Sequence, residues 1–431
     1  MQFDRMKFHR PVSTSKMHTY TKNVQMNLKS ALRPLQRVSQ VLGLNLSNLL
    51  GRIYTWFIFM TFFAITYGGS SQLCSLDCGK NAIDSFVIWI QFAANTVLAL
   101  TVITCSLFKP HQYGFPHQDL APIDKVLESF GARLTNNRLF WTEMFQIVLI
   151  VAVPLLFGFQ DIRKSIQLKS FYYSLYWLHY YYSVSVSIVT DCLFVNYLNI
   201  IRERFQQLNK LMTLIEKEKL PLTITFLGIS DSDIFCGQYK GDVISKIQKF
   251  RSLHHDLYTL SIKVNVNFGI QLLVNSTISL VITTGQLYES YLNFIDNRLN
   301  VEQIMYNTLW TFFYVFRLIY VSHACNRTKN EARYTSSLLY KFSMKSKLQD
   351  LRNEVIHFSL QLIHENVTFT ACGFFDIDFR MLCSIIGTVT TYLVILIQMD
   401  LSRIELTSTT SHLPSTRKFC SSSPNASRDF V

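Results

Sequence analysis

The sequence predicts an all-α membrane protein with seven transmembrane helices, a cytoplasmic N-terminus and a layer of cytoplasmic helices. Three observations lead to this fold class. Only 16% of the 431 residues are charged and 49% are hydrophobic, whereas soluble proteins carry about 25% charged residues. Seven stretches approach the ~20 apolar residues that a helix needs to cross a bilayer. Basic residues are concentrated in alternate loops between these stretches.

The seven predicted spans differ in clarity. The last is the clearest, whereas the first is short on apolar residues but opens with Tyr54-Thr55-Trp56-Phe57, which suits a membrane interface. The spans are predicted at 53–67, 85–108, 139–159, 171–199, 264–288, 304–325 and 381–399.

The distribution of Lys and Arg predicts the orientation. The segment before the first span carries nine basic residues and the next short loop carries one; over all loops and tails the two sides hold 31 and 9. By the positive-inside rule the N-terminus is cytoplasmic and the C-terminus lies outside. The concentration of basic residues on the cytoplasmic side of the membrane therefore explains the net charge of +13. We expect membrane lipid as a partner and no nucleic acid.

Three parts of the chain follow from these spans. Residues 1–52 form a cytoplasmic N-terminal segment, 53–399 the seven-span domain, and 400–431 an extracellular tail. The tail is rich in Ser, Thr and Pro, which predicts disorder. Asn425 begins an Asn-Ala-Ser sequon there and is the predicted glycosylation site.

Apolar residues at helical spacing continue outside the spans. We predict short helices at 31–41 and 44–50, separated by Gly43, and extensions of spans four and six over 200–212 and 332–342. A loop at 228–241 precedes a helix at 243–260 that leads into span five, and a helix at 348–362 precedes the last span. Several helices with one apolar stripe each predict a packed cytoplasmic layer.

The sequence contains no HExxH, P-loop or Gly-x-Ser-x-Gly motif. We therefore expect no enzyme, no cofactor and no metal ion. The sequence also shows no internal repeat and no evident acid deep in a span, and both observations argue against a transporter.

Aromatic residues gather in the predicted outer halves of the middle spans. Part of the run 171–182 suits an interfacial belt, but the run is about 16 Å long. Either its inner side lines a pocket for small organic molecules, or these residues are core packing. The candidate ligand residues are Trp89, Tyr176, Trp177, Gln286, Tyr288, Trp310, Tyr314 and Arg317.

Arg317 is the one basic residue predicted deep in a span, on a stripe with Trp310, Tyr314 and Val321. A charge there costs several kcal/mol unless it is paired or hydrated. No acid occupies an obvious matching position, so we expect a water-filled cavity, or pairing with backbone carbonyls or a tyrosine hydroxyl.

The last span carries Thr391-Tyr392, five aliphatic residues, Gln398 and Met399. An amide in hydrocarbon normally faces protein or water. The motif resembles the signature of insect gustatory receptors, in which Thr-Tyr, five hydrophobic residues and Gln-Phe follow one another, with Met399 in place of Phe. The run 369–378 before this span, and Asn265 and Asn267 in span five, also resemble that family.

The resemblance implies a ligand-gated, non-selective cation channel that senses small-molecule tastants. It implies a homo- or hetero-tetramer whose pore is lined by the last helix, with Tyr392, Gln398 and Met399 as pore and gate residues. Leu393 stands where sugar-sensing members tend to carry an acid, which favours bitter or other non-sugar ligands. The alternatives are a sugar-sensing member of the same family and a G-protein-coupled chemoreceptor.

The charge asymmetry predicts that an epitope tag at the N-terminus is stained only after the plasma membrane is permeabilised. A tag at the C-terminus should be stained on intact cells. An N-terminal tag that is visible on intact cells would contradict the predicted topology and favour the G-protein-coupled alternative.

Overall fold

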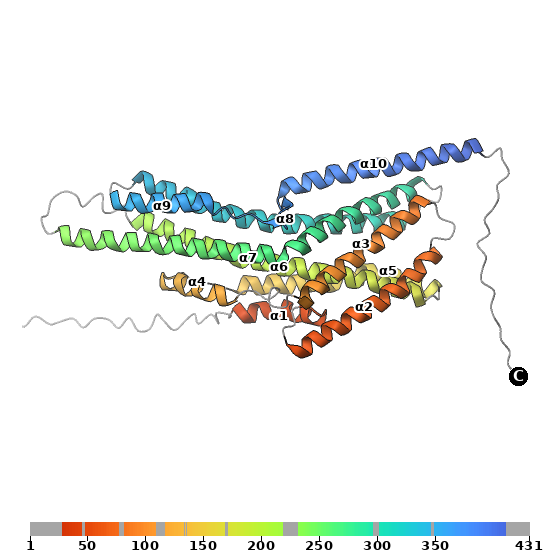
Figure 1. Ribbon diagram of the computed structural model, residues 1–431, viewed down its shortest axis with the longest axis horizontal. Coiled ribbons are helices and arrows are strands. Elements are labelled where there is room, and N and C mark those ends of the chain that lie inside the picture. Colours follow the sequence, from red (N-terminus) through yellow and green to blue (C-terminus); the bar gives the residue numbers. More distant parts are fainter. Residues whose placement is uncertain are drawn as a thin grey trace, which may run out of the picture.

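The structure, a computed structural model, describes residues 28–44, 48–76, 82–108, 117–132, 134, 136–168, 171–218, 232–295, 301–345 and 349–410. These residues form an elongated helical bundle with one short hairpin (Figure 1). The predicted glycosylation site Asn425 lies outside them. The elements are α1 (Leu28–Val41), α2 (Leu49–Leu76), α3 (Ala82–Phe108), α4 (His117–Ser129), α5 (Asn137–Leu168), α6 (Phe171–Glu218), α7 (Ser232–Ile295), α8 (Val301–Lys345), α9 (Gln349–His364), β1 (Thr370–Ala371), β2 (Phe375–Asp376) and α10 (Phe379–Thr410).

Three helices are much longer than a membrane is thick. α6, α7 and α8 contain 48, 64 and 45 residues, or about 70, 95 and 70 Å at 1.5 Å per residue. A bilayer core is about 30 Å thick, so more than half of each helix lies outside it. The predicted extensions of spans four and six, and the helix leading into span five, are confirmed.

Six of the described helices are long and apolar enough to cross a membrane: α2, α3, α5, α6, α7 and α10. The predicted span 304–325 lies in α8, which is less apolar because it contains Asn307 and Arg317. Both side chains are buried, and α8 packs against α6 and α7. With α8, the bundle has the seven spans that the sequence predicts.

The predicted cytoplasmic layer occupies one end of the bundle. Figure 1 shows α4 and α9 there, beside the extended parts of α6, α7 and α8. α1 packs on α5 and α6, α4 on α6 and α7, and α9 on α7 and α8. Leu35 of α1, Leu127 of α4 and Phe358 of α9 are fully buried, so each helix uses its apolar stripe for packing.

Some boundaries differ from the predictions. Gly43 takes a φ of +80° after α1, and the last two residues of the short helix expected at 44–50 belong to α2, which begins at Leu49. Residues 232–241 of the loop expected over 228–241 are helical, since α7 begins at Ser232, and α10 continues past Met399 to Thr410. A helix that has already formed gains one hydrogen bond for each residue added, which favours such extensions.

α6 is the central helix of the bundle. In its most apolar stretch 89% of the residues are buried, compared with 11% in that of α10 and 17% in that of α2. It contacts α2, α3, α5, α7 and α8. α6 is therefore surrounded by protein, whereas most of α10 has no neighbour among the residues that the structure describes.

A two-stranded hairpin, which the sequence analysis did not predict, joins the last helix to α7. β1 and β2 pair antiparallel with Thr370 opposite Asp376, and Gly373 in the turn has a φ of +79°, which favours glycine. Asn265 of α7 holds the hairpin: its Oδ1 accepts from the backbone N–H of Thr370 at 3.0 Å and its Nδ2 donates to Thr370 Oγ1 at 3.3 Å.

The first turn of α10 follows directly. Asp378 accepts hydrogen bonds from the backbone N–H groups of Arg380 at 2.9 Å and Met381 at 3.2 Å. An Asp in this position satisfies donors that have no partner within the helix, and typically contributes about 1 kcal/mol. The base of α10 is thus held to α7 through the hairpin.

Candidate functional site

Aromatic side chains from α5, α6 and α8 meet in the predicted outer half of the bundle. Trp310 of α8, 1% exposed, stacks on Phe157 of α5 with ring centroids 4.1 Å apart and meets Tyr180 of α6 edge-on at 5.2 Å. Tyr314, one turn along α8, is fully buried, and its hydroxyl lies 3.4 Å from that of Tyr180. We call Phe157, Tyr180, Trp310 and Tyr314 the outer aromatic cluster.

A carboxylate adjoins this cluster. Asp161 of α5 is 2% exposed and accepts hydrogen bonds from the hydroxyls of Tyr306, at 2.9 Å, and of Tyr181. The ring of Tyr306 lies 5.8 Å from that of Phe157. The site therefore combines ring faces, phenol hydroxyls and one carboxylate, which are groups that bind small organic molecules.

The other predicted residues of span four lie at the border of the cluster. The ring of Trp177 is 5.7 Å from that of Tyr180, so Trp177 adjoins it. Tyr176 turns toward α3, where its ring stacks on Phe92 at 5.9 Å. Tyr180 and Phe157 were not predicted, although Tyr180 lies in the aromatic run 171–182.

Of the predicted residues of spans two and five, Gln286 lies where α3 meets α7. Gln286, 6% exposed, donates to Gln91 of α3 at 3.4 Å. Gly285 permits this approach, because a Cβ there would lie 2.2 Å from Gln91 Nε2. Tyr288 is fully buried, whereas Trp89 is 40% exposed. The contact of Gln286 with Gln91 thus places it between α3 and α7, whereas the outer aromatic cluster is formed by α5, α6 and α8.

Arg317 of α8 is paired with Asp191 of α6. Its Nη2 lies 2.7 Å from Asp191 Oδ2. Asn275 of α7 donates to Asp191 Oδ1 at 2.6 Å and accepts from Arg317 Nη2 at 2.8 Å. Ser187 contacts Arg317 and donates to Asn275 Oδ1 at 2.8 Å. These four residues, here called the Arg317–Asp191 network, are all at most 9% exposed.

Two sequence-based expectations are wrong here. Arg317 has an acidic partner, and the spans do contain acids, since Asp191 lies in the predicted span 171–199 and Glu143 in 139–159. The pairing was missed because it joins residues 126 apart on different helices, which no local spacing reveals. The cavity beside the network measures about 10 Å³, room for about one water rather than the water-filled cavity expected.

A second polar contact joins α5, α6 and α8 nearer the predicted cytoplasmic side. Gln146 of α5 and Asn196 of α6 exchange two side-chain hydrogen bonds of 3.0 and 2.8 Å. Gln146 also donates to the hydroxyl of Tyr320 on α8 at 2.7 Å. α5, α6 and α8 are thus joined below the outer aromatic cluster by groups that would be costly to separate in a low-dielectric interior.

The predicted gate residues lie on α10 and face away from the bundle. Tyr392 and Met399 are 51% and 53% exposed, and Gln398 is also exposed. The buried side chains among the described residues of α10 are Met381, Val389 and Asp400. Ser384, Thr391 and Gln398 follow one another at seven-residue intervals and are all exposed, so they form a polar line along the helix.

Comparison with known proteins points to one family. The model of the family described as 7tm chemosensory receptor matches residues 32–403. Gustatory receptor 2a of Drosophila melanogaster is 28% identical over 178 residues, which cover 35% of this chain and 40% of that protein. The gustatory receptor for bitter taste 66a of the same organism is 27% identical over 167 residues, which cover 37% of this chain and 31% of that protein.

Each of these alignments spans less than half of the related protein. Among solved structures, the insect olfactory receptor OR5 from Machilis hrabei in complex with eugenol matches 86% of this chain and 98% of that chain, with a TM-score of 0.51 and 12% identity. At this identity the likeness concerns the fold. The relatives are receptors, in agreement with the expectation that the chain is not an enzyme.

The Arg317–Asp191 network predicts a strong dependence of stability on either partner. Asp191→Asn should lower the free energy of unfolding by about 3–5 kcal/mol, because it leaves a buried guanidinium without its counter-charge. The double change Arg317→Met with Asp191→Leu should recover much of this loss. Thermal unfolding of the detergent-purified protein measures both effects.

The exposed pair of Lys263 and Asp119 serves as the control. Its atoms are 2.9 Å apart and its side chains are 51% and 42% exposed, so Lys263→Met should cost at most about 1 kcal/mol. Equal losses for Asp191→Asn and Lys263→Met would contradict a structural role of the network.

Proposed function

The chain belongs to the 7tm chemosensory receptor family, and on this basis we propose that it is a gustatory receptor that opens a non-selective cation channel when a small-molecule tastant binds. The observation that carries the proposal is the exposure of α10. A membrane helix that exposes Ser384, Thr391 and Gln398 along one line is poorly suited to lipid on that side. If several copies of α10 surround a common axis, this polar line can face the water of a central pore.

The proposed assembly is a homo- or hetero-tetramer with α10 at its centre. Gln398 and Met399 are consecutive, so their side chains point about 100° apart on the helix. With the pore axis between these two directions, both side chains reach the lining of the pore. A ring of thioethers would then close the outer mouth by excluding water, beside a ring of amides that hydrates ions when the mouth widens.

The contacts between the helices suggest how a ligand would act on α10. A ligand that enters the outer aromatic cluster would separate or reorient α5, α6 and α8. The Arg317–Asp191 network joins α6 and α8 to α7, and Asn265 joins α7 to the hairpin at the base of α10. A shift of α8 relative to α7 would therefore reach the pore helix through hydrogen-bonded groups.

The proposed ligands are bitter or other non-sugar organic molecules. The outer aromatic cluster is built largely from ring faces with a few polar groups, which suit alkaloids and other small organic molecules as well as sugars. A relative named for bitter taste and a similarly folded receptor in complex with eugenol support this choice. A sugar-sensing receptor of the same family is the alternative, and Leu393 in place of an acid argues against it.

The ligand site predicts that Tyr314→Phe and Trp310→Phe raise the activating concentration several-fold. The first change removes one buried hydroxyl and the second reduces a ring without emptying the core. Calcium imaging of transfected cells, with eugenol and a panel of bitter alkaloids as probes, measures the response. Surface biotinylation measures the amount of receptor at the plasma membrane.

Phe312→Leu is the matched control, because Phe312 lies on the same helix and is 69% exposed. It should leave the activating concentration unchanged. Variants of Tyr314 and Trp310 that lose surface expression while the remaining receptor keeps its normal activating concentration would show that these residues only pack the core.

The pore proposal predicts that Met399→Ala leaks current without ligand, because a smaller side chain leaves room for water at the closed mouth. Gln398→Ala should change conductance or ion preference, and Leu393→Ala should do less than either. Whole-cell recording of the three variants tests this. Silent Met399→Ala channels at a normal surface level would mean that the constriction lies elsewhere.

A further inference from the structure

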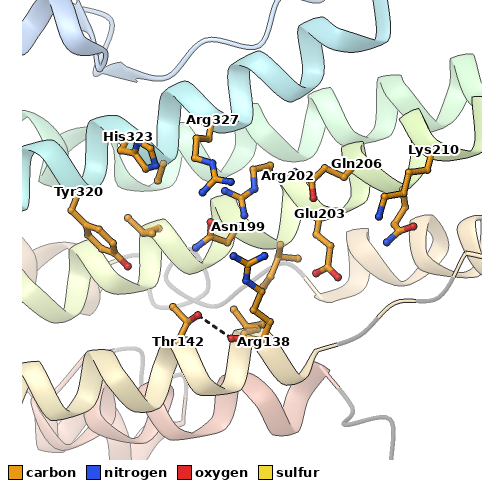
Figure 2. A pocket seen from close by; sticks show the side chains of 15 residues that line it. Arg138, Thr142, Asn199, Arg202, Glu203, Gln206, Lys210, Tyr320, His323 and Arg327 are labelled. Carbon is orange, nitrogen blue, oxygen red and sulfur yellow. Dashed lines mark hydrogen bonds between the residues drawn. The ribbon is translucent and has the colours of Figure 1, made fainter. Parts of the chain in front are cut away.

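A cavity lies at the predicted cytoplasmic end of α5, α6 and α8, away from the outer aromatic cluster. It has a volume of about 380 Å³, within the usual range for small-molecule sites. Figure 2 shows its walls: Arg138 at the start of α5, Arg202 and Lys210 on α6, and Arg327 on α8. We call it the inner basic cavity.

Its charges are unbalanced. Glu203 is the one acid among the lining residues, and its carboxylate already accepts a hydrogen bond of 3.1 Å from Arg204. Within the described part of the chain, Arg138, Arg202, Arg327 and Lys210 form no ion pair. The cavity therefore holds four cations and one engaged carboxylate.

The nearest further acids are also engaged. Glu331 on α8 accepts from the amides of Gln206 at 3.2 Å and Asn209 at 3.0 Å. Asp124 of α4 binds Arg204 at 3.0 and 3.2 Å.

The guanidinium groups converge on one space. Figure 2 shows Arg202 and Arg327 pointing toward each other from α6 and α8, with Arg138 reaching toward the same space from α5. Burial and the like charges of Arg327 and Arg138 lower the pKa of Arg202, although Glu331 and Glu203 oppose this effect. The buried Nε of Arg202 has no hydrogen-bond partner in the described part of the chain. Like charges held together in a partly buried site are unfavourable unless an anion joins them, and planar guanidinium groups match phosphate oxygens with two hydrogen bonds each.

The flanks of the cavity are apolar on the membrane side. Trp141 and Phe145 of α5 are 71% and 64% exposed, and Phe316 and Ile319 of α8 are 60% and 42% exposed. Trp141 and Phe145 lie within about two turns of Arg138, and Ile319 and Phe316 lie about two and three turns from Arg327 along α8. A molecule with a phosphate in the cavity could thus lay hydrocarbon chains on the surfaces of α5 and α8.

We propose that the inner basic cavity binds the phosphorylated headgroup of an anionic lipid of the cytoplasmic leaflet, of the phosphoinositide class. Basic pockets between transmembrane helices on the cytoplasmic side are suited to such headgroups. The arginines of three helices contact one headgroup, so its binding removes their mutual repulsion and holds α5, α6 and α8 together. This site does not depend on the proposed channel function.

Thermal unfolding of the full-length, detergent-purified protein tests the proposal, because a ligand that binds the folded state raises Tm. The probes are dioctanoyl phosphatidylinositol 4,5-bisphosphate, the same lipid's soluble headgroup inositol 1,4,5-trisphosphate, and inorganic phosphate. The lipid should raise Tm and reach saturation at a lower concentration than the soluble headgroup, and inorganic phosphate should have little effect. Equal effects of all three would assign the cavity to soluble anions and overturn the lipid proposal.

The double variant Arg202→Gln with Arg327→Gln should raise the half-saturating lipid concentration about tenfold or more, because each arginine supplies charge-assisted hydrogen bonds. Its Tm without lipid should not fall, since a repulsive pair is removed. Arg138→Gln, on another helix, gives an independent test should the double variant fail to fold, and it too should weaken lipid binding.

The matched control is Arg333→Gln with Arg352→Gln, which removes two exposed cytoplasmic arginines outside the cavity. It should bind the lipid as the unchanged protein does. The proposal is overturned if this control loses as much affinity as the cavity variant, or if neither cavity variant changes the half-saturating concentration.

Discussion

The buried ion pair between Arg317 and Asp191 is the constraint on which the rest of the bundle depends. A guanidinium and a carboxylate in the middle of a membrane bundle are tolerated only when each satisfies the other. Asn275 supplies a donor to the carboxylate and an acceptor to the guanidinium, so the third helix is required as well. Apolar packing alone would allow α6, α7 and α8 to slide, whereas this network allows one register.

The same register fixes the position of α10, which has the smallest buried share of the candidate membrane spans. Asn265 lies on α7, ten residues before Asn275, and binds the hairpin that precedes α10. α10 is therefore firmly attached at its base and exposed over most of its length. A helix held in this way can turn about its base without breaking the core, and its exposed faces are available to other copies of the chain. Buried residues are thus concentrated in α6, whereas α10 leaves most of its surface exposed.

Local patterns predicted the helices well and the contacts between them poorly. The apolar spacing over 200–212 indicated that span four continues beyond the membrane, because periodicity is a local property. Trp310 and Tyr314 were grouped correctly, since they lie one turn apart on one helix. The partner of Arg317 could not be found in this way, although Asp191 stood in a predicted span. The hairpin was also missed, because strands of two residues carry no alternation to detect.

The inner basic cavity and the outer aromatic cluster share α5, α6 and α8, and this shared frame has a thermodynamic consequence. A headgroup that bridges Arg138, Arg202 and Arg327 would favour one spacing of the three helices at their cytoplasmic ends. A ligand between Phe157, Tyr180 and Trp310 would favour a spacing at their outer ends. Gln146, Asn196 and Tyr320 join the helices between the two sites, so the spacings are not independent. Coupling of this kind is reciprocal: a lipid that changes the affinity for a tastant must have its own affinity changed by the tastant by the same factor.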